Sequence, residues 1–270
     1  MANRQGADTA PILPGAETID LQEGDSNGVL LLHGFGDTPQ TLTLLARRLK
    51  KSGYSVLAPL LPGHGRTTES FAKSRASDWI AAAQSAYTGM RARHRSVSIA
   101  GLSMGGALAT ILASEQHDIP ALALIAPYVG MAGRLRVAAA THWLWGKLAG
   151  EIGARNLQSI HDPIEREKNL AYGTVTGREL HELWMVVRRA RKSLSAVRAP
   201  ALIIQSREDP RCSPATAEFA LRTLGSQEKK LVWTEGAGHI ITVDYGRERV
   251  FSEVERWLDI HNGRGAAAAR

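Results

Sequence analysis

Cysteine is almost absent from this 270-residue sequence, in which Cys212 stands alone. A single cysteine excludes an intrachain disulfide and a metal site built from several cysteines. Long apolar runs are missing too: stretches such as residues 29–32 fall far short of the roughly 20 residues that cross a bilayer. We therefore expect no multi-cysteine metal site, no integral membrane association and a fold stabilised by packing.

Aromatic residues are also scarce, at 6% of the chain, which gives little support to a broad stacking surface. The formal net charge is +7, and of the 33 basic residues eight are lysine and 25 arginine. We interpret this arginine bias as a habit of composition, because no nucleic-acid-binding module or interleaved aromatic pattern accompanies it. We expect no nucleic-acid partner.

The remaining composition is that of a globular protein, with 44% hydrophobic and 22% charged residues. Residues 1–18 lack the apolar core of a secretory signal, so we expect a cytoplasmic location. We assign residues 1–18 to a flexible N-terminal segment, 19–262 to a single domain and 263–270 to a flexible C-terminal tail. The expected oligomeric state is a monomer or a homodimer.

Short apolar or β-branched runs of strand length alternate along the chain with segments of helical spacing. Several of these runs are apolar almost throughout, so both faces of the sheet must be covered. The alternation predicts an α/β fold with a mostly parallel central sheet and helices on both faces. The runs span residues 29–33, 55–59, 96–100, 121–127, 201–206 and 229–235.

The alternation is interrupted once, between Pro127 and Arg198, where about 70 residues separate two expected strands. Apolar residues at helical spacing predict a small helical cap inserted at about residues 128–190. Large side chains of this insertion could line a substrate channel or simply pack the cap against the sheet, and both interpretations stay open. The candidates are Trp143, Trp145, Trp184 and Met185.

The sequence GLSMGG at residues 101–106 directly follows the expected strand 96–100 and precedes a helical pattern. A G-x-S-x-G motif at a strand-to-helix turn is typical of a nucleophile elbow. The flanking glycines remove Cβ atoms that would clash in such a sharp turn, and the helix N-terminus favours developing negative charge. We predict that Ser103 is a catalytic nucleophile.

A serine hydroxyl needs a base within hydrogen-bond reach, and that base needs an acid to orient it. In the chain order nucleophile, acid, histidine, the loops after the last two expected strands supply Asp209 and His239. Glu208 is the alternative acid, but we favour Asp209 for its place in the loop and its shorter, stiffer side chain. Asp244 follows His239 closely, and we interpret it as opening the last helix.

Acyl transfer also needs N–H donors directed at the oxyanion of the tetrahedral intermediate. We expect them from the main chain of Phe35, in the glycine-rich stretch 33–37, and of Met104, directly after the nucleophile. His33 could act as a second base. We interpret its side chain instead as holding this loop by hydrogen bonding.

Five motifs together resemble the bacterial carboxylesterase and monoacylglycerol lipase family of α/β-hydrolases: HGFG, PGHG, GLSMGG, PALIIQSRED and GHIITVD. The resemblance runs from about Gly28 to His261 and implies the α/β-hydrolase fold, with the cap inserted after the sixth strand of that fold. It implies no metal and no organic cofactor. It also implies Ser103 as nucleophile, His239 as base, Asp209 as orienting acid, and Phe35 and Met104 as oxyanion donors.

Two stretches depart from the family pattern. The acid loop at residues 210–214 reads PRCSP, where relatives commonly carry a histidine or a similar residue and then apolar residues. The stretch from Tyr128 to Gly153 also differs, so no substrate-binding residue can be carried over to this chain.

The leading hypothesis is a serine ester hydrolase that cleaves short- to medium-chain acyl esters, or a monoglyceride, through an acyl-enzyme intermediate. Its expected partner is a small-molecule acyl ester. A thioesterase, a feruloyl esterase or an acyltransferase would use the same triad. A non-catalytic binding protein with a hydrolase fold is the alternative of another class, but such a protein normally loses a member of the triad.

Overall fold

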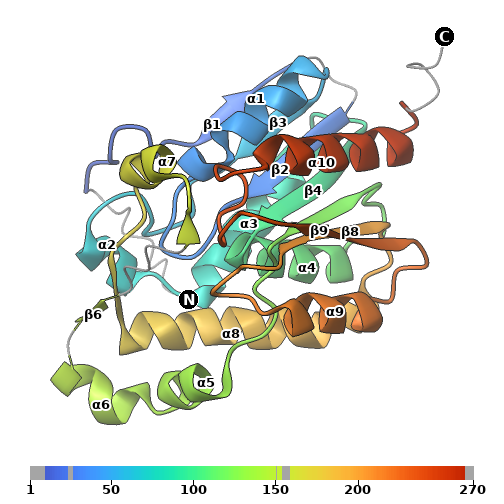
Figure 1. Ribbon diagram of the computed structural model, residues 1–270. Coiled ribbons are helices and arrows are strands. Elements are labelled where there is room, and N and C mark those ends of the chain that lie inside the picture. The colour runs from blue at the N-terminus through green and yellow to red at the C-terminus, as the bar shows by residue number, and fades with distance from the viewer. Residues whose placement is uncertain (1–9, 24–26, 150, 154–158, 265–270) are drawn as a thin grey trace, which may run out of the picture.

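The computed structural model describes residues 10–23, 27–149, 151–153 and 159–264. Its centre is a seven-stranded sheet in the spatial order β1-β3-β2-β4-β5-β8-β9 (Figure 1). β1 pairs with β3 antiparallel and all other neighbours are parallel, so the predicted mostly parallel sheet is confirmed. The strands are β1 (Ile19–Leu21), β2 (Asn27–Leu32), β3 (Ser55–Ala58), β4 (Ser96–Leu102), β5 (Leu122–Ile125), β8 (Ala201–Ser206) and β9 (Lys229–Thr234).

Helices cover both faces of the sheet, because successive strand side chains point to opposite faces. In β2, Leu30 and Leu32 pack in one core cluster while Val29 and Leu31 pack in the other. The first cluster lies under α3 (Ala76–Arg91), α4 (Met104–Glu115), α8 (Gly177–Ser193) and α9 (Pro214–Thr223). The second lies under α1 (Thr43–Lys51) and α10 (Arg247–His261) (Figure 1).

Each of the six predicted strands is present, with its ends shifted by a few residues at most. β1 was not predicted, since it is a three-residue edge strand whose side chains are only partly buried or exposed. Its hydrophobic pattern is therefore too short to detect. Two short connecting elements precede β4, namely η1 (Pro39–Leu42) and α2 (Thr68–Lys73).

The expected insertion lies between β5 and β8. Counted from β1, β5 is the fifth strand of the described chain. The insertion contains a two-stranded antiparallel sheet that the sequence did not predict, because its strands have only three residues each. Before α8 it comprises α5 (Gly133–Ala140), α6 (His142–Ala149), β6 (Glu151–Gly153), α7 (Pro163–Lys168) and β7 (Thr174–Thr176), and η3 (Leu194–Ala196) follows α8.

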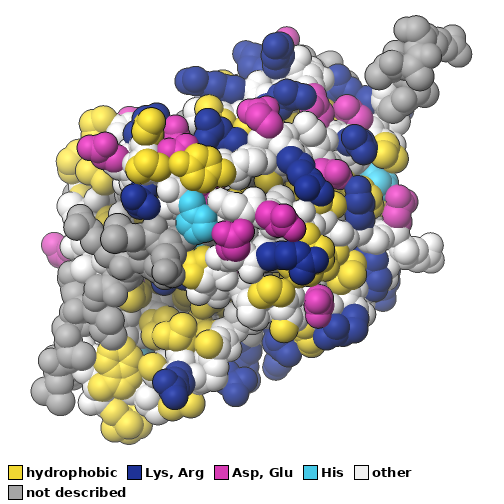
Figure 2. All heavy atoms as spheres, viewed as in Figure 1, with side chains coloured by type: hydrophobic (Ala, Val, Ile, Leu, Met, Phe, Trp, Pro, Cys, Tyr) yellow, Lys and Arg dark blue, Asp and Glu magenta, His cyan; other side chains and the backbone are white. Residues whose placement is uncertain are grey.

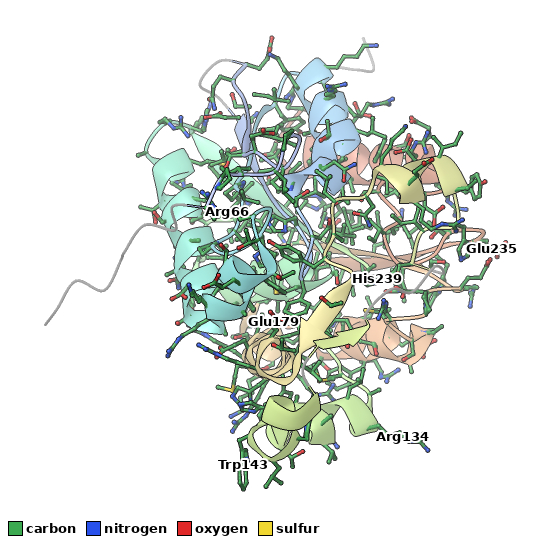
Figure 3. All side chains as sticks on the ribbon, turned by 90° about the vertical axis from the view of Figure 1, so that its left-hand side faces the viewer. Arg66, Arg134, Trp143, Glu179, Glu235 and His239 are labelled. Carbon is green, nitrogen blue, oxygen red and sulfur yellow. The ribbon has the colours of Figure 1, made fainter. Side chains whose placement is uncertain are left out.

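The cap carries an exposed apolar surface on α5 and α6, and Figure 2 shows apolar side chains gathered at this end of the molecule. Trp143 on α6 is 68% exposed and points away from His239 (Figure 3). The channel-lining interpretation is therefore wrong for Trp143, because helical spacing alone does not tell which side of a helix meets the protein. Met185 on α8 is also exposed.

Trp145 and Trp184 are partly buried and pack within the cap. The Trp145 ring lies so close to α8 that a Cβ on Gly177 would come within 2.9 Å of it, and its Nε1 donates to the carbonyl of Ala138 at 3.0 Å. The ring of Trp184 has the guanidinium of Arg188 at 5.7 Å from its centre. For Trp145, packing between α6 and α8 is thus the observed role.

The two ends of the described chain contact the domain. In the segment assigned to residues 1–18, Leu13 N donates to Gly65 O at 2.8 Å and Ala16 is fully buried. In the segment 263–270, the guanidinium of Arg264 lies 4.4 Å from the ring centre of Tyr54. Residues 1–9 and 265–270 of these segments lie outside the described residues. No helix in the described ranges has the length and apolar character needed to span a membrane.

Candidate active site

Ser103 occupies the turn between β4 and α4. Its φ of 56° lies in the left-handed region that L-residues rarely adopt. A Cβ on Gly105 would lie 1.9 Å from the carbonyl oxygen of Leu32, and one on Gly101 would lie 2.2 Å from that of Gly105. Only glycines fit at these two positions, so the motif explains why the chain can turn this sharply and expose Ser103.

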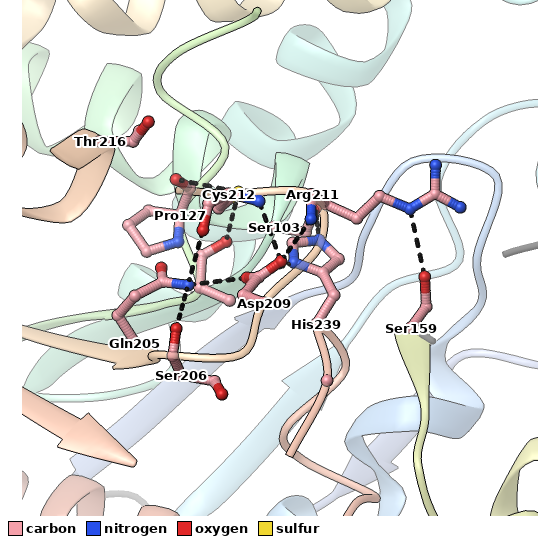
Figure 4. A network of polar contacts seen from close by, with 12 residues as sticks. Ser103, Pro127, Ser159, Gln205, Ser206, Asp209, Arg211, Cys212, Thr216 and His239 are labelled. Atoms are coloured by element: carbon pink, nitrogen blue, oxygen red, sulfur yellow. Dashed lines mark hydrogen bonds and ion pairs between the residues drawn. The ribbon is translucent and has the colours of Figure 1, made fainter. Parts of the chain in front are cut away.

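The structure brings the three predicted side chains together, although they are far apart in the sequence (Figure 4). Ser103 Oγ lies 2.7 Å from Nε2 of His239, and Nδ1 of His239 lies 2.7 Å from Oδ2 of Asp209. Asp209 follows β8 and His239 follows β9, at the carboxyl edge of the sheet where parallel strands place such loops. This geometry permits a proton to pass from the hydroxyl to the imidazole.

The carboxylate of Asp209 is enclosed by hydrogen-bond donors. Oδ1 accepts from the backbone N–H groups of Arg211 at 2.7 Å and Cys212 at 2.9 Å. Oδ2 accepts from His239 and also from Nε2 of Gln205, both at 2.7 Å. Burial by itself would raise the pKa of Asp209, but the His239 charge and the hydrogen bonds from His239, Cys212 and Arg211 outweigh it and lower the pKa.

Glu208, the alternative acid, does not contact His239 in the structure. Its side chain is 51% exposed, and its Oε1 accepts from the backbone N–H of Gly236 at 2.7 Å. The hydrogen bond to the imidazole comes from the neighbouring carboxylate of Asp209.

The interpretation of Asp244 as the start of the last helix is wrong. α10 begins at Arg247, after Gly246 with a φ of 73°, and the fully buried Asp244 carboxylate binds backbone instead. Two of its donors are Gly238 N at 2.7 Å, next to His239, and His161 N at 2.8 Å, in the insertion. Asp244 therefore ties the histidine loop to the cap, a long-range role that sequence proximity could not reveal.

The two expected oxyanion donors lie beside Ser103. Met104 is the first residue of α4, so its N–H has no acceptor one helical turn earlier. Phe35 follows Gly34, whose backbone packs so close to Ser103 that a Cβ on Gly34 would lie 3.4 Å from the Ser103 Cβ. The Phe35 ring rests on Phe71, with ring centres 5.0 Å apart.

His33 holds this loop from within the core. The ring is fully buried, with Nε2 accepting from Leu61 N at 3.1 Å and Nδ1 lying 2.9 Å from Gly34 O. One acceptor and one donor nitrogen are what a neutral imidazole provides. Burial lowers the pKa of His33 to about 4, which keeps the ring neutral at physiological pH.

Asp37 is a buried carboxylate in the same loop that sequence reasoning missed. It accepts from Thr38 N and from the Thr41 hydroxyl, both at 2.8 Å. Burial raises the pKa of Asp37 to about 6, against which these two hydrogen bonds and the His239 charge act only in part. An aspartate in a glycine-rich loop looks solvent-exposed in sequence, so no local pattern signals its burial.

Among the described residues, one group at the site has the spacing of metal ligands: potential ligand atoms of Asp209, Cys212 and His239 lie within 4.8 Å of one another. Asp209 and His239 are already bonded to each other. The Cys212 thiol is buried, with Sγ 3.6 Å from Ala126 O, and burial raises its pKa. A protonated thiol is a poor metal ligand, so these residues do not fit a metal ion.

Proteins that expose a serine at such a turn, on a parallel sheet with the acid and the histidine on later loops, form the α/β-hydrolase class. Residues 26–245 match the family described as serine aminopeptidase, S33, and the chain belongs to this family.

Relatives and solved structures agree with this assignment. The chain is 31% identical over 255 residues to a thermostable monoacylglycerol lipase of Bacillus sp. (strain H-257), covering 94% of this chain and 98% of the relative. It is 26% identical over 242 residues to a carboxylesterase of Bacillus subtilis (strain 168), covering 88% and 94%. A solved structure from work on the metagenome-derived lipolytic enzymes LipS and LipT superimposes with a TM-score of 0.85 at 31% identity, covering 93% of this chain and 100% of that one.

These comparisons confirm the resemblance that the motifs predict. The chain is a serine ester hydrolase of the α/β-hydrolase fold, and such an enzyme acts on small-molecule substrates.

Proposed function

We propose that this chain hydrolyses short- to medium-chain acyl esters, monoacylglycerols among them, through an acyl-enzyme intermediate on Ser103. In this proposal His239 is the base and Asp209 the orienting acid. The observation that carries it is the continuous contact from Ser103 Oγ to His239 Nε2 and from His239 Nδ1 to Asp209 Oδ2, with 2.7 Å at each step.

The reaction begins when the Ser103 hydroxyl attacks the ester carbonyl and its proton passes to Nε2 of His239. The oxyanion of the tetrahedral intermediate accepts from the N–H groups of Phe35 and Met104 at the positive end of α4. His239 then donates its proton to the departing alkoxide, and the alcohol leaves. A water molecule, deprotonated by His239, attacks the acyl-enzyme, and collapse releases the acid and restores Ser103.

The substrate class rests on the relatives. The two Bacillus relatives are named for monoacylglycerols and for carboxylic esters. Thioesterase, feruloyl esterase and acyltransferase chemistry would use the same triad, but these relatives favour ester hydrolysis. A non-catalytic binding role is disfavoured because the serine, histidine and aspartate are all present and in contact.

The direct test measures purified protein on p-nitrophenyl esters from acetate to palmitate, on monoacylglycerols, on triacylglycerols and on thioesters. We expect turnover with a sharp optimum at short or medium chain length and a preference for monoacylglycerols. Ser103→Ala should lower kcat by several orders of magnitude while the fold is kept. Undiminished ester turnover by this variant would refute the assignment, and a flat chain-length profile would refute an acyl-measuring cap.

The oligomeric state and the location stay predictions from the sequence: a monomer or a homodimer, in the cytoplasm. Size-exclusion chromatography with light scattering tests the first. Fractionation of the producing cells tests the second.

A further inference from the structure

Gln205 is a fully buried polar residue near the end of β8, in a strand whose other members before it are apolar. Its Nε2 lies among three acceptor oxygens (Figure 4): Asp209 Oδ2 at 2.7 Å, Cys212 O at 3.2 Å and Ser206 O at 3.3 Å. Only a donor suits a position between three acceptors, so the amide nitrogen rather than the oxygen must face Asp209.

The other end of the same amide has no comparable partner. Gln205 Oε1 is buried and finds no hydrogen-bond partner among the residues that the structure describes. An unpartnered buried carbonyl destabilises a fold, and an apolar side chain of the same length would avoid that loss. The stability of the strand therefore does not account for the amide, whereas its contact with Asp209 does.

The hydrogen bond from Gln205 falls on the oxygen that also binds His239. Oδ2 of Asp209 accepts from both, and Oδ1 accepts from two backbone N–H groups of the acid loop. Gln205 thus occupies one lone-pair direction of Oδ2 and leaves the other directed at Nδ1 of His239. Through Cys212 O the same amide also holds the acid loop, the stretch that departs from the family pattern.

We propose that Gln205 is a positioning residue that orients the Asp209 carboxylate. Its hydrogen bond also weakens the electrostatic stabilisation that this carboxylate gives to the protonated form of His239. The proposal rests on the proposed function, because it assumes that Asp209 orients His239 during ester hydrolysis. Gln205 acts through Asp209 and the loop that carries it, and does not touch the reacting atoms.

The informative variant is Gln205→Met, which keeps the length of the side chain and removes the donor. Loss of a hydrogen bond to a charged group should lower kcat by roughly tenfold or more. KM should change little, since the side chain does not contact the substrate. The acidic limb of the kcat/KM profile should move to higher pH, because a carboxylate with one donor fewer stabilises the imidazolium of His239 more strongly.

Other titratable groups around the Asp209–His239 pair are Asp37, Tyr128, Arg211 and Cys212. Burial gives Asp37 a pKa of about 6, so its charge also changes within the pH range over which the profiles are recorded. All four groups are the same in the wild type and in Gln205→Met. The difference between the two pH profiles therefore reports on the changed hydrogen bond.

The matched control is Ile203→Val, which loosens the same strand on the same side without reaching Asp209. We expect wild-type kcat and an unshifted pH profile for it. In a double-mutant cycle, Gln205→Met should reduce kcat much less in an Asp209→Asn background than in the wild type. The reason is that Gln205 acts through the Asp209 carboxylate, which the Asp209→Asn substitution has already removed. Additive losses would overturn the proposal.

A second variant, Gln205→Glu, keeps the polar shape should Gln205→Met fail to fold. The new carboxyl can donate to Asp209 only while protonated, so its activity should fall as the pH rises through the ionisation of the new group. A profile parallel to that of the wild type would overturn the proposal.

Ser103→Ala distinguishes a failure of the positioning role of Gln205 from a failure of the proposed function. If Ser103→Ala abolishes turnover while Gln205→Met keeps wild-type kcat and pH profile, the positioning role fails alone. If Ser103→Ala retains turnover, the proposed function fails and the positioning role fails with it.

Discussion

Two buried carboxylates lie within the site and differ in their partners. Asp209 accepts four hydrogen bonds, among them the one from His239, and its pKa is lowered. Asp37 accepts two, from Thr38 N and from the Thr41 hydroxyl, and burial raises its pKa to about 6. Asp209 is therefore ionised under working conditions, whereas the charge of Asp37 changes in the physiological range.

Asp209→Asn should lower kcat by about 10⁴-fold, because the amide cannot hold His239 in the tautomer that accepts the serine proton. Glu208→Gln is the matched control, since it removes the charge of the adjacent residue, whose carboxylate binds Gly236 N. We expect its kcat to stay within about threefold of the wild type. Steady-state kinetics on p-nitrophenyl butyrate measure kcat for both variants. A larger loss of kcat in Glu208→Gln than in Asp209→Asn would identify Glu208 as the orienting acid.

Asp37→Asn should change how stability depends on pH. Burial raises the pKa of Asp37 from 3.8 to about 6, so the folded state binds this proton more tightly than the unfolded state. The resulting stabilisation is full below about pH 4 and is lost as the pH rises through about 6. The unfolding free energy of Asp37→Asn relative to wild type should thus rise by up to about 3 kcal/mol between pH 4 and pH 8.

Urea unfolding at these two pH values measures this difference. Asp20→Asn, which changes an exposed aspartate on β1, is the control and should show little pH-dependent difference from wild type. If the Asp37→Asn difference is the same at pH 4 and pH 8, Asp37 does not titrate as described.

At the scale of elements, the strands and the elbow were predictable because each carries a local signal. β8 is apolar along most of its length, and the GLSMGG turn needs glycine where Cβ atoms would meet backbone. Ser103 directly follows β4, whereas Asp209 and His239 lie in the loops after β8 and β9, which places all three at one edge of the sheet. Asp37 and Gln205 bond to residues that are close in the sequence, but no local pattern signals that their side chains are buried. Asp244 also accepts from His161 N, which comes close only in the fold, so sequence proximity does not predict its role.

Gly105→Ala should destabilise the protein by more than about 3 kcal/mol, because the new Cβ would meet the carbonyl of Leu32 in the neighbouring strand. Gly89→Ala is the matched control: Gly89 lies within α3, and a Cβ there meets nothing within 4 Å. It should stabilise the protein by about 0.5–1 kcal/mol. Thermal unfolding compares the two, and equal effects would contradict the steric account of the elbow.

At the scale of the whole molecule, the cap and the sheet meet around the site. Tyr172, in the insertion, donates from N to Gly36 O at 2.8 Å and from its hydroxyl to Gly63 O at 3.1 Å. Its ring stacks on Phe71, with ring centres 4.9 Å apart. The insertion therefore contacts the loop that carries Phe35 and holds it through Tyr172. The insertion itself was predictable from its length, but the outward direction of Trp143 was not.

Substitutions of two tryptophans on α6 test which side of this helix stabilises the cap. Trp145→Ala should destabilise the protein by about 2 kcal/mol or more and alter the chain-length profile, because it removes the packing of α6 on α8. Trp143→Ala, at an exposed position of the same helix, should change the unfolding free energy by less than about 0.5 kcal/mol and leave the profile unchanged. Urea unfolding and the ester panel measure both effects, and a reversed order would contradict the described packing of α6.

The central claim, that Ser103 is a nucleophile activated by His239, is tested most directly by covalent labelling. A serine-directed organophosphonate is added to the intact protein, and the modified peptide is identified by mass spectrometry. We predict one adduct on Ser103, formed rapidly in the wild type and at least about 100-fold more slowly in His239→Ala. An adduct on another residue, or labelling of Ser103 at the same rate without His239, would contradict the account.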